Sequence, residues 1–213
     1  MTAAPDRRFD LVTFDLDGTL LPHDMAFAAI LRGNGHAALA DEATRKFAAG
    51  TWTLPETYGR QWDVVKGLSL ADMHRALRGA AWLPGIAEGV RRLHAGGYRT
   101  CILTDVASTV TDFLGRWGLT DAICSPVTVK DGRQVALDRR LDKLANLRGR
   151  LAAWAIPESR VCHVGNGEND VPVFRAVGGS VAVFPNPGVA EAAAVVLPEP
   201  RSLDDVVDAV FRL

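Results

Sequence analysis

The chain has 213 residues, enough for one large domain or for one domain with an insert. Hydrophobic residues make up 48%, which is typical of a globular protein, and the net charge of −1 with no lysine or arginine run argues against nucleic acid as a partner. No stretch has the length and apolarity of a signal peptide or a membrane span, so we expect a soluble, cytoplasmic protein that does not bind membranes.

Strands and helices alternate along most of the chain, and glycine or proline marks many of their ends. The expected order is strand 9–14, helix 84–96, strand 98–103 ending at Thr104, helix 107–117, helix 141–155, strand 160–164 ending at Gly165, strands 180–184 and 194–197, and helix 202–211, with Ser202 as N-cap and Asp205 completing a capping-box-like pair. Cys101, Cys162 and His163 fall in strand patterns, where we expect core residues, the thiols in a reducing compartment. This alternation predicts an α/β fold with a doubly wound parallel sheet.

Residues 21–83 break the alternation because they read as helices only. The four helices are expected at 25–31, 38–48, 55–66 and 69–77, the last with Ser69 and Asp72 at its start. Asp131-Gly132 predicts a hairpin over 129–135. We expect a core domain of residues 1–20 and 84–213 and a small helical cap domain, residues 21–83, inserted after the first strand over the ligand crevice; the alternative is that these helices extend the core domain.

The stretch LVTFDLDGTLL, residues 11–21, places Asp15 and Asp17 at the end of an apolar strand. A calcium loop opening at Asp15 would need glycine at its sixth position and glutamate at its twelfth, and neither is present. Ligands of doubly wound sheets bind at the carboxyl ends of strands. Asp15, Thr104 and the pair Gly165-Asn166 all fall at such ends, so we expect them to converge on one crevice.

Together, DLDGTL after a strand, Thr104 at the end of another, Lys143, and GNGEND (residues 165–170) resemble the haloacid dehalogenase superfamily, most closely its phosphoserine-phosphatase-like branch. The resemblance covers nearly the whole chain, and the spacing from Lys143 to GNGEND equals that of the family. It implies a Rossmann-like core with a helical cap and a magnesium-dependent phosphatase that acts through an aspartyl phosphate.

The resemblance also implies roles for individual residues. Asp15 would be the nucleophile, and Asp17 the general acid and then the base. The hydroxyl of Thr104 and the ammonium of Lys143 would hold the phosphoryl oxygens, and Gly18 would let the backbone approach them. Thr104 and Lys143 also have simpler explanations. A threonine at a strand end is commonly a cap, and an isolated lysine on a helix is usually solvated.

Magnesium would be held by oxygen ligands in this crevice. The ligands implied are the Asp15 side chain, the Asp17 carbonyl and Asn166, with Asp170 orienting a metal-bound water or, failing Asn166, binding the metal itself. Asp170 could instead cap the helix that starts near Asn169. Asn166 departs from the family, whose metal loop usually begins Gly-Asp.

Two further departures concern the substrate. Thr104 is followed by Asp105 where phosphoserine phosphatases usually have glycine, and Gln61 stands where the family's cap arginine pairs with the substrate carboxylate. Asp24 matches the family's cap glutamate. We therefore assign Gly18, Asp24, Gln61 and Asp105 to substrate binding and expect phosphoserine to be a poor substrate.

Trp52, Tyr58 and Trp62 could line the pocket of the leaving group, although aromatic residues in a small cap more often form its core.

The expected function is a phosphatase of a small organic phosphate monoester, with the chain a monomer or homodimer. A phosphomutase or phosphotransferase of the same superfamily shares Asp15 and Asp17 and remains possible. So does a catalytically weakened phosphate-binding relative, which Asn166 makes plausible.

Overall fold

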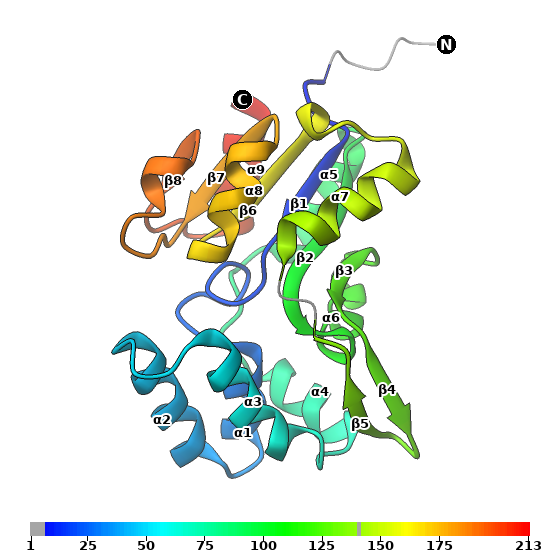
Figure 1. The fold of residues 1–213 in the computed structure, drawn as a ribbon. Coiled ribbons are helices and arrows are strands. Elements are labelled where there is room, and N and C mark those ends of the chain that lie inside the picture. Colours follow the sequence, from blue (N-terminus) through cyan, green and yellow to red (C-terminus); the bar gives the residue numbers. More distant parts are fainter. Residues whose placement is uncertain (1–6, 140–141) are drawn as a thin grey trace.

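A parallel sheet forms the centre of the chain, for which the computed structural model describes residues 7–139 and 142–213 (Figure 1). Its six strands lie in the order β3-β2-β1-β6-β7-β8, and every neighbouring pair is parallel. The strands are β1 (Leu11–Phe14), β2 (Arg99–Ala107), β3 (Ala122–Ser125), β6 (Val161–Gly165), β7 (Gly179–Val183) and β8 (Val195–Leu197). The predicted Rossmann-like α/β fold is confirmed.

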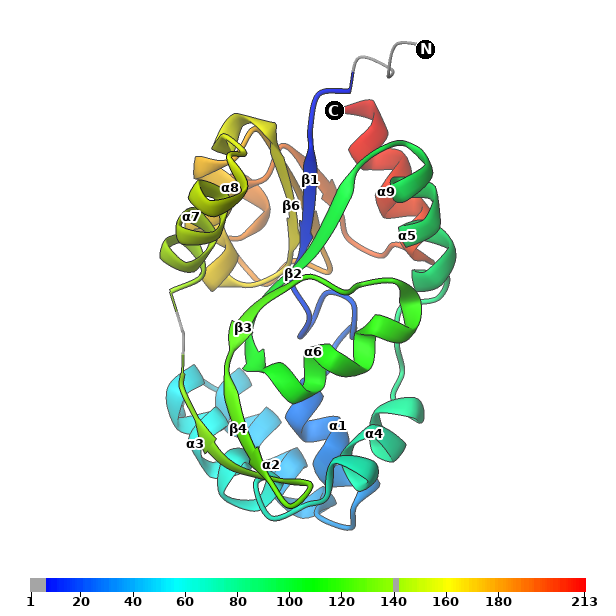
Figure 2. The same ribbon diagram turned by 90° about the vertical axis from the view of Figure 1, so that its right-hand side faces the viewer.

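Helices cover both faces of this sheet, which explains why all four residues of β1 are buried. One face carries α5 (Ile86–Ala95) and α9 (Leu203–Arg212), and the other carries α7 (Lys143–Trp154) and α8 (Val171–Ala176) (Figure 2). Residues alternate between the two cores: Val12 and Phe14 belong to the larger cluster, whereas Leu11 packs with Leu147 of α7. Helix α6 (Ser108–Leu114) follows β2, and short 3₁₀ turns lie at Gly115–Trp117, Glu158–Arg160, Glu168–Asp170 and Ala190–Ala192.

A block of four helices lies beyond the carboxyl ends of the strands (Figure 1). It comprises α1 (Ala26–Gly33), α2 (Ala37–Ala48), α3 (Leu54–Val65) and α4 (Leu70–Arg78). Thr53 and Glu56 form a capping box at the start of α3, and the Ser69 side chain accepts a hydrogen bond from the Asp72 N–H at the start of α4. The chain enters and leaves this block at one point, where the Leu83 N–H donates to the Leu20 carbonyl (2.9 Å).

The antiparallel hairpin of β4 (Val127–Lys130) and β5 (Arg133–Leu137) packs against the helical block. Asp131 and Gly132 both have positive φ (50° and 71°), as a two-residue hairpin turn requires. The Leu70 N–H donates to the Gly132 carbonyl (3.1 Å), and the buried Gln134 donates to the sulfur of Met73 (3.1 Å). The predicted hairpin is therefore present, and it extends the helical block rather than the sheet.

Three sequence expectations were wrong in detail. The strand expected to end at Thr104 continues to Ala107, because its later residues pair with β3 across a register shift between Leu103 and Ala107. Strand β3 itself was missed. The Ser202 side chain makes no capping hydrogen bond; instead Asp205 accepts from the Arg201 N–H (2.8 Å). The expected first residue of the 141–155 helix lies outside the described residues.

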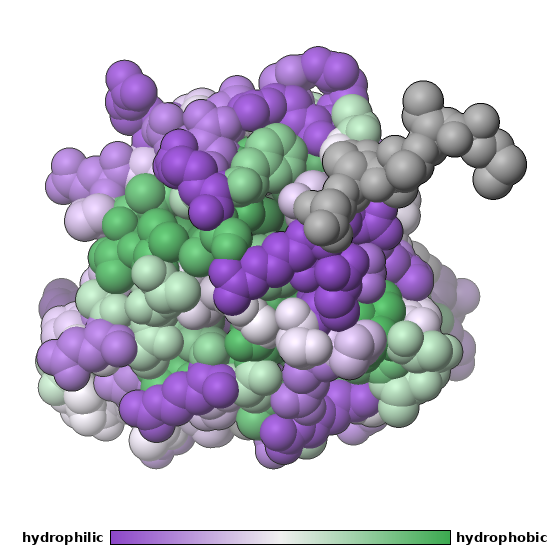
Figure 3. All heavy atoms as spheres, turned by 90° about the horizontal axis from the view of Figure 1, so that it is seen from above, coloured by the Kyte–Doolittle hydropathy of each residue, from purple (hydrophilic) through white to green (hydrophobic). Residues whose placement is uncertain are grey.

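The C-terminus and the first described residue, Arg7, lie at the end of the molecule opposite the helical block (Figure 1). Seen from above, hydrophilic side chains surround an area of hydrophobic ones there (Figure 3). Apolar atoms make up more than half of an ordinary protein surface, so this area alone indicates no function. Within residues 7–139 and 142–213, we find no helix with the length and apolarity needed to cross a membrane.

Candidate active site

The register of the sheet brings the predicted site residues to one edge. Phe14 pairs with Ile102 of β2 and with Val164 of β6. The residues that follow on each strand therefore emerge side by side, and the Asp15 N–H still donates to the Val164 carbonyl (2.8 Å). The helical block lies directly beyond this edge (Figure 1).

Lys143 joins two carboxylates in the middle of the site. Its Nζ lies 2.7 Å from Asp15 Oδ1 and 2.7 Å from Asp170 Oδ1, and all three side chains are buried. Burial by itself lowers the pKa of Lys143, but the carboxylates of Asp15 and Asp170 outweigh it and raise the pKa well above its usual value. Burial raises the pKa of Asp15 to about 8, with Lys143 opposing and the charge of Asp170 reinforcing the shift.

Asp170 accepts four hydrogen bonds from other described residues. Its Oδ1 accepts from Lys143 and from Nε2 of His163 (3.0 Å), and its Oδ2 accepts from the N–H groups of Asn166 (2.9 Å) and Gly167 (3.0 Å). Burial acts to raise the pKa of Asp170, but Lys143 and His163 prevail and hold it well below its usual range. With both oxygens engaged in this way, Asp170 is better placed to orient its neighbours than to bind a metal directly.

His163 is completely buried behind Asp170, as its strand position predicts. Its Nδ1 lies 2.8 Å from the hydroxyl of Thr13. With Nε2 facing a carboxylate, the ring donates to Asp170 and Nδ1 accepts from Thr13. His163 is thus a core residue that also supports the site.

Gly18 lies in the turn after Asp17 with φ of +75°. A Cβ at this position would clash with the side-chain amide of Asn166, so glycine suits both this φ and the close approach of the two loops. The Asn166 side chain is nearly buried and its Oδ1 accepts a long hydrogen bond from the Thr19 hydroxyl (3.5 Å). The motif after β1 and the loop after β6 are therefore in direct contact.

Asp17 is held by the first turn of α1 and by the middle of α3. Its Oδ1 accepts from the Ala26 N–H (2.8 Å), and its Oδ2 accepts from the hydroxyl of Tyr58. Burial raises the pKa of Asp17 to about 6 against the opposing effect of both hydrogen bonds. Burial and the charge of Asp17 raise the pKa of Tyr58 well above its usual value, so its phenol is a donor.

Thr104 and Asp105 lie in the irregular stretch of β2, where ladder pairing with β3 is interrupted. The Thr104 hydroxyl accepts a long hydrogen bond from the Val106 N–H (3.4 Å). One oxygen of Asp105 accepts from Asn169 (2.9 Å), and the other is buried without a hydrogen-bond partner in the described part of the chain. Burial raises the pKa of Asp105.

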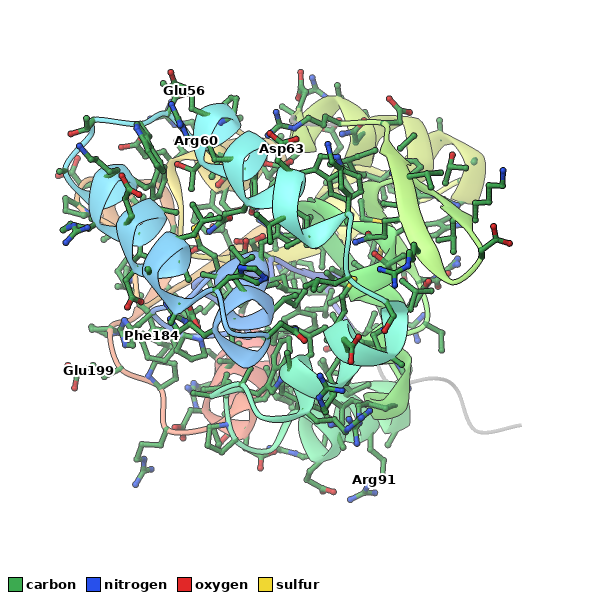
Figure 4. The ribbon with its side chains drawn as sticks, turned by 90° about the horizontal axis from the view of Figure 1, so that it is seen from below. Glu56, Arg60, Asp63, Arg91, Phe184 and Glu199 are labelled. Carbon is green, nitrogen blue, oxygen red and sulfur yellow. The ribbon has the colours of Figure 1, made fainter. Side chains whose placement is uncertain are left out.

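Gln61 is fully buried on α3, one turn beyond Tyr58, and both atoms of its amide have no partner among the described residues. The adjacent Arg60 is exposed and stacks over Trp52, with its Cζ 4.4 Å from the ring centroid. Glu56, Arg60 and Asp63 mark the exposed side of α3 in Figure 4. Asp24 is engaged elsewhere, because its Oδ2 accepts from Arg32 (2.7 Å).

Two supporting residues escaped sequence reasoning in different ways. Tyr58 was considered only as a wall of the leaving group or a core residue, and its contact with Asp17 joins positions 41 apart in the chain. Its position one helical turn before Gln61 was the available signal. His163 gave none, because a histidine inside an apolar strand looks like any buried core residue.

The site suits a hard cation such as magnesium. Asp15, Asp17, Asp105 and Asp170 gather around Lys143, and burial raises the pKa of the first three although the charge of Lys143 opposes the shift in each. Among the described residues, no three His, Cys, Asp or Glu side chains form a metal cluster by themselves. The expected ligands differ from such a cluster because they include the Asp17 carbonyl and the Asn166 amide oxygen.

Comparison with known proteins agrees with this arrangement. The profile of the haloacid dehalogenase-like hydrolases matches residues 12–175. The chain belongs to this family. The chain is 28% identical over 194 residues to a phosphoserine phosphatase of Streptomyces coelicolor, covering 86% of this chain but only 46% of that protein. It is 23% identical to a phosphoserine phosphatase of Methanocaldococcus jannaschii, covering 95% of this chain and 98% of that one.

Solved structures support the fold. A substrate-bound phosphoserine phosphatase complex superposes with a TM-score of 0.79 at 19% identity, over 96% of this chain and 99% of that one. The family and its phosphoserine-phosphatase-like branch, both predicted from the sequence, are confirmed. The prediction of an enzyme that hydrolyses phosphoric monoesters is also confirmed.

Proposed function

We propose that this hydrolase is a magnesium-dependent phosphatase of a small organic phosphate monoester other than phosphoserine, acting through an aspartyl phosphate on Asp15. The observation that carries the proposal is the contact of Lys143 with Asp15 and Asp170, each at 2.7 Å. A buried lysine held between two carboxylates at a strand end is placed to bind the oxygens of a phosphoryl group beside the nucleophile.

In the first half of the proposed reaction, a carboxylate oxygen of Asp15 forms a bond to phosphorus and the ester P–O bond breaks. The departing alkoxide oxygen takes the proton of Asp17, so an alcohol leaves. A carboxyl group whose pKa is raised to about 6 keeps its proton to a higher pH than an ordinary aspartate does, which suits a general acid. Lys143 and the Thr104 hydroxyl hold the phosphoryl oxygens as they move.

In the second half, water attacks the phosphorus of the aspartyl phosphate. Asp17, now a carboxylate, takes a proton from that water, and the bond between phosphorus and Asp15 breaks. Inorganic phosphate leaves, Asp15 is restored as a carboxylate and Asp17 again carries a proton. The helical block, residues 21–83, serves as the cap that excludes bulk water during both steps.

Magnesium would be held by the Asp15 side chain, the Asp17 carbonyl and the Asn166 amide oxygen, with Asp170 orienting the loop that carries Asn166. When bound, it would offset the charge of the phosphate and of the surrounding carboxylates. Gly18 permits this set because it lets Asn166 lie against the turn after Asp17.

The substrate follows from Gln61 and Asp24. A zwitterionic substrate such as phosphoserine needs a cation for its carboxylate and an anion for its ammonium group. Gln61 is neutral, and Asp24 already pairs with Arg32. The buried amide of Gln61 offers one acceptor and two donors without partners, which suits a hydroxyl or amide on an uncharged leaving group. Replacing a charge-assisted bidentate pair by a neutral one lowers binding by about 2–3 kcal/mol, or roughly 30- to 150-fold.

A panel of metabolite phosphates, assayed by phosphate release with and without magnesium, tests the proposal. We expect a hydroxylated or amide-bearing ester at the top, phosphoserine well below it, and no release without magnesium. An isomerised product without phosphate release would indicate a mutase instead. Phosphoserine at the head of the panel would overturn the substrate assignment. We place the enzyme in the cytoplasm, as a monomer or homodimer.

A further inference from the structure

We propose that Tyr58 is a positioning residue for acid–base catalysis: its hydroxyl, carried by the helical block, fixes the carboxylate of Asp17 in the orientation that meets the leaving group. The inference deepens the proposed function and rests on the role given there to Asp17. It starts from one contact, in which the Tyr58 hydroxyl donates to Oδ2 of Asp17.

The two oxygens of Asp17 are held from two different helices. Oδ1 accepts from the Ala26 N–H at the first residue of α1 (2.8 Å), and Oδ2 accepts from Tyr58 in α3. A donor on each oxygen fixes the plane of the carboxylate as well as its position. Each oxygen keeps a second lone pair, so the group can still exchange a proton with a substrate oxygen or with water.

Tyr58 is itself held firmly. It is only 5% exposed, and its ring meets Phe27 of α1 edge to face, with centroids 5.7 Å apart and planes at 83°. Phe27 also contacts Trp62, one turn beyond Tyr58 on α3, with centroids 6.2 Å apart. A phenol locked in this aromatic cluster loses little freedom on donating to Asp17, so its hydrogen bond directs the carboxylate rather than following it.

The same contact couples the helical block to the chemistry. Asp17 follows β1 of the sheet, whereas Tyr58 lies in the block beyond the sheet edge. The acid is therefore fully oriented only while the block sits on the core. Proton transfer is sensitive to displacements of about 1 Å, which can lower rates by roughly 100-fold. Through the Tyr58 hydroxyl, protonation of the leaving group by Asp17 therefore depends on the helical block being in place.

The test compares two leaving groups in Tyr58→Phe, which removes one oxygen and keeps the buried ring. An alkyl phosphate needs protonation of its leaving oxygen, whereas 4-nitrophenyl phosphate releases a stable phenolate without it. We expect kcat/KM to fall roughly 10- to 100-fold for the alkyl ester and less than about twofold for the aryl ester. Tyr98→Phe is the matched control, because Tyr98 is the other of the chain's two tyrosines and stacks on Phe211 away from the site.

Asp17→Asn separates this inference from the proposed function. It should show the same asymmetry between leaving groups, and Tyr58→Phe should add nothing in its background. Asymmetry in Asp17→Asn but not in Tyr58→Phe overturns the role of Tyr58 and leaves the proposed function standing. Equal losses for both esters in Asp17→Asn overturn the acid role of Asp17 and this inference with it.

A second measurement does not depend on how Tyr58→Phe folds. Protein grown with 3-fluorotyrosine has two fluorine sites, and Tyr98→Phe identifies the signal of residue 58. We expect Asp17→Asn to shift the fluorine resonance of residue 58 and to leave that of residue 98 unchanged. No shift at residue 58 would overturn the proposal.

Discussion

Nζ of Lys143 lies 2.7 Å from Oδ1 of Asp15, which joins the first residue of α7 to the residue that follows β1. Asp142 caps this helix by accepting from the Ala145 N–H (2.9 Å), so the helix start is fixed on both sides of the lysine. A contact between residues 15 and 143 can form only when α7 packs across the sheet. The fold itself therefore assembles the nucleophile with its cation.

Asp15→Asn should abolish turnover with every substrate, lowering it by more than about 1,000-fold, because an amide oxygen does not replace the nucleophilic carboxylate. We expect its melting temperature to be unchanged or higher. Burial raises the pKa of Asp15 against the opposing charge of Lys143, and a neutral amide avoids the cost of burying that charge. Phosphate release and thermal unfolding measure both effects. Asp10→Asn, at the other end of the same strand, is the control and should retain activity. Wild-type turnover in Asp15→Asn would show that another residue is the nucleophile.

Gln61→Leu should stabilise the protein and impair it as an enzyme. The substitution removes two buried polar atoms that have no partners among the described residues, which should raise the free energy of unfolding by about 1–3 kcal/mol. The same change removes the group assigned to the substrate, so kcat/KM for the preferred ester should fall. Denaturant unfolding measures the change in stability, and steady-state kinetics measures the change in kcat/KM.

The control for Gln61→Leu is 4-nitrophenyl phosphate, whose leaving group has no hydroxyl or amide to bind. Its kcat/KM should change little in the variant. Loss of stability on substitution, with equal losses for both substrates, would show instead that Gln61 is a structural residue.

The sequence predicted most of the fold because its signals are local. Apolar strands, glycines at helix ends and the Asp131-Gly132 turn each act through a few neighbouring residues. The extension of β2 beyond Thr104 was missed because it depends on pairing with β3, a contact between segments about 20 residues apart. Ser202 is the N-cap residue of α9, as predicted, but its side chain makes no capping hydrogen bond; Asp205 accepts from Arg201, a choice between near-equal partners that sequence does not resolve.

Within the site, sequence located residues but not their hydrogen bonds. The motif predicted Asp15, Asp17 and Lys143, and the register of the sheet brings their segments together. It could not show that Asp170 accepts from four donors, that Asp24 pairs with Arg32, or that Tyr58 bonds to Asp17. These contacts depend on how whole elements pack. The proposed roles of the site residues remain predictions that the experiments above address.

Asp10→Asn should lower stability at neutral pH but not in acid. Asp10 accepts two hydrogen bonds from Arg160 (2.9 and 3.0 Å) and two from Arg7 (3.2 and 3.3 Å). The hydrogen bond from Arg160 and its charge lower the pKa of Asp10 below the ordinary value of 3.8, despite some burial. The folded state thus binds fewer protons than the unfolded state. The contribution is present above pH 3.8 and disappears as the pH falls through the lower, folded-state pKa.

For this partly exposed group we expect a difference of at most about 1 kcal/mol between wild type and Asp10→Asn at neutral pH. Urea unfolding at a series of pH values measures it. A difference that grows as the pH falls would contradict the predicted sign.

Asn166→Asp should tighten magnesium binding. The amide of Asn166 is a neutral ligand where a carboxylate adds a full negative charge, and affinity for hard cations follows ligand charge. We expect at least about a tenfold lower dissociation constant, a change of roughly 1.4 kcal/mol. Turnover need not rise, because a less neutralised metal is the stronger Lewis acid.

Calorimetric titration with magnesium measures the change in affinity. The protein is used fresh and is checked by mass spectrometry for deamidation at Asn166-Gly167. Asn169→Asp, in the same loop, is the control for added charge; it also removes the hydrogen bond that Asn169 donates to Asp105. Equal affinity in wild type and Asn166→Asp would refute the neutral-ligand argument and point to direct coordination by Asp170.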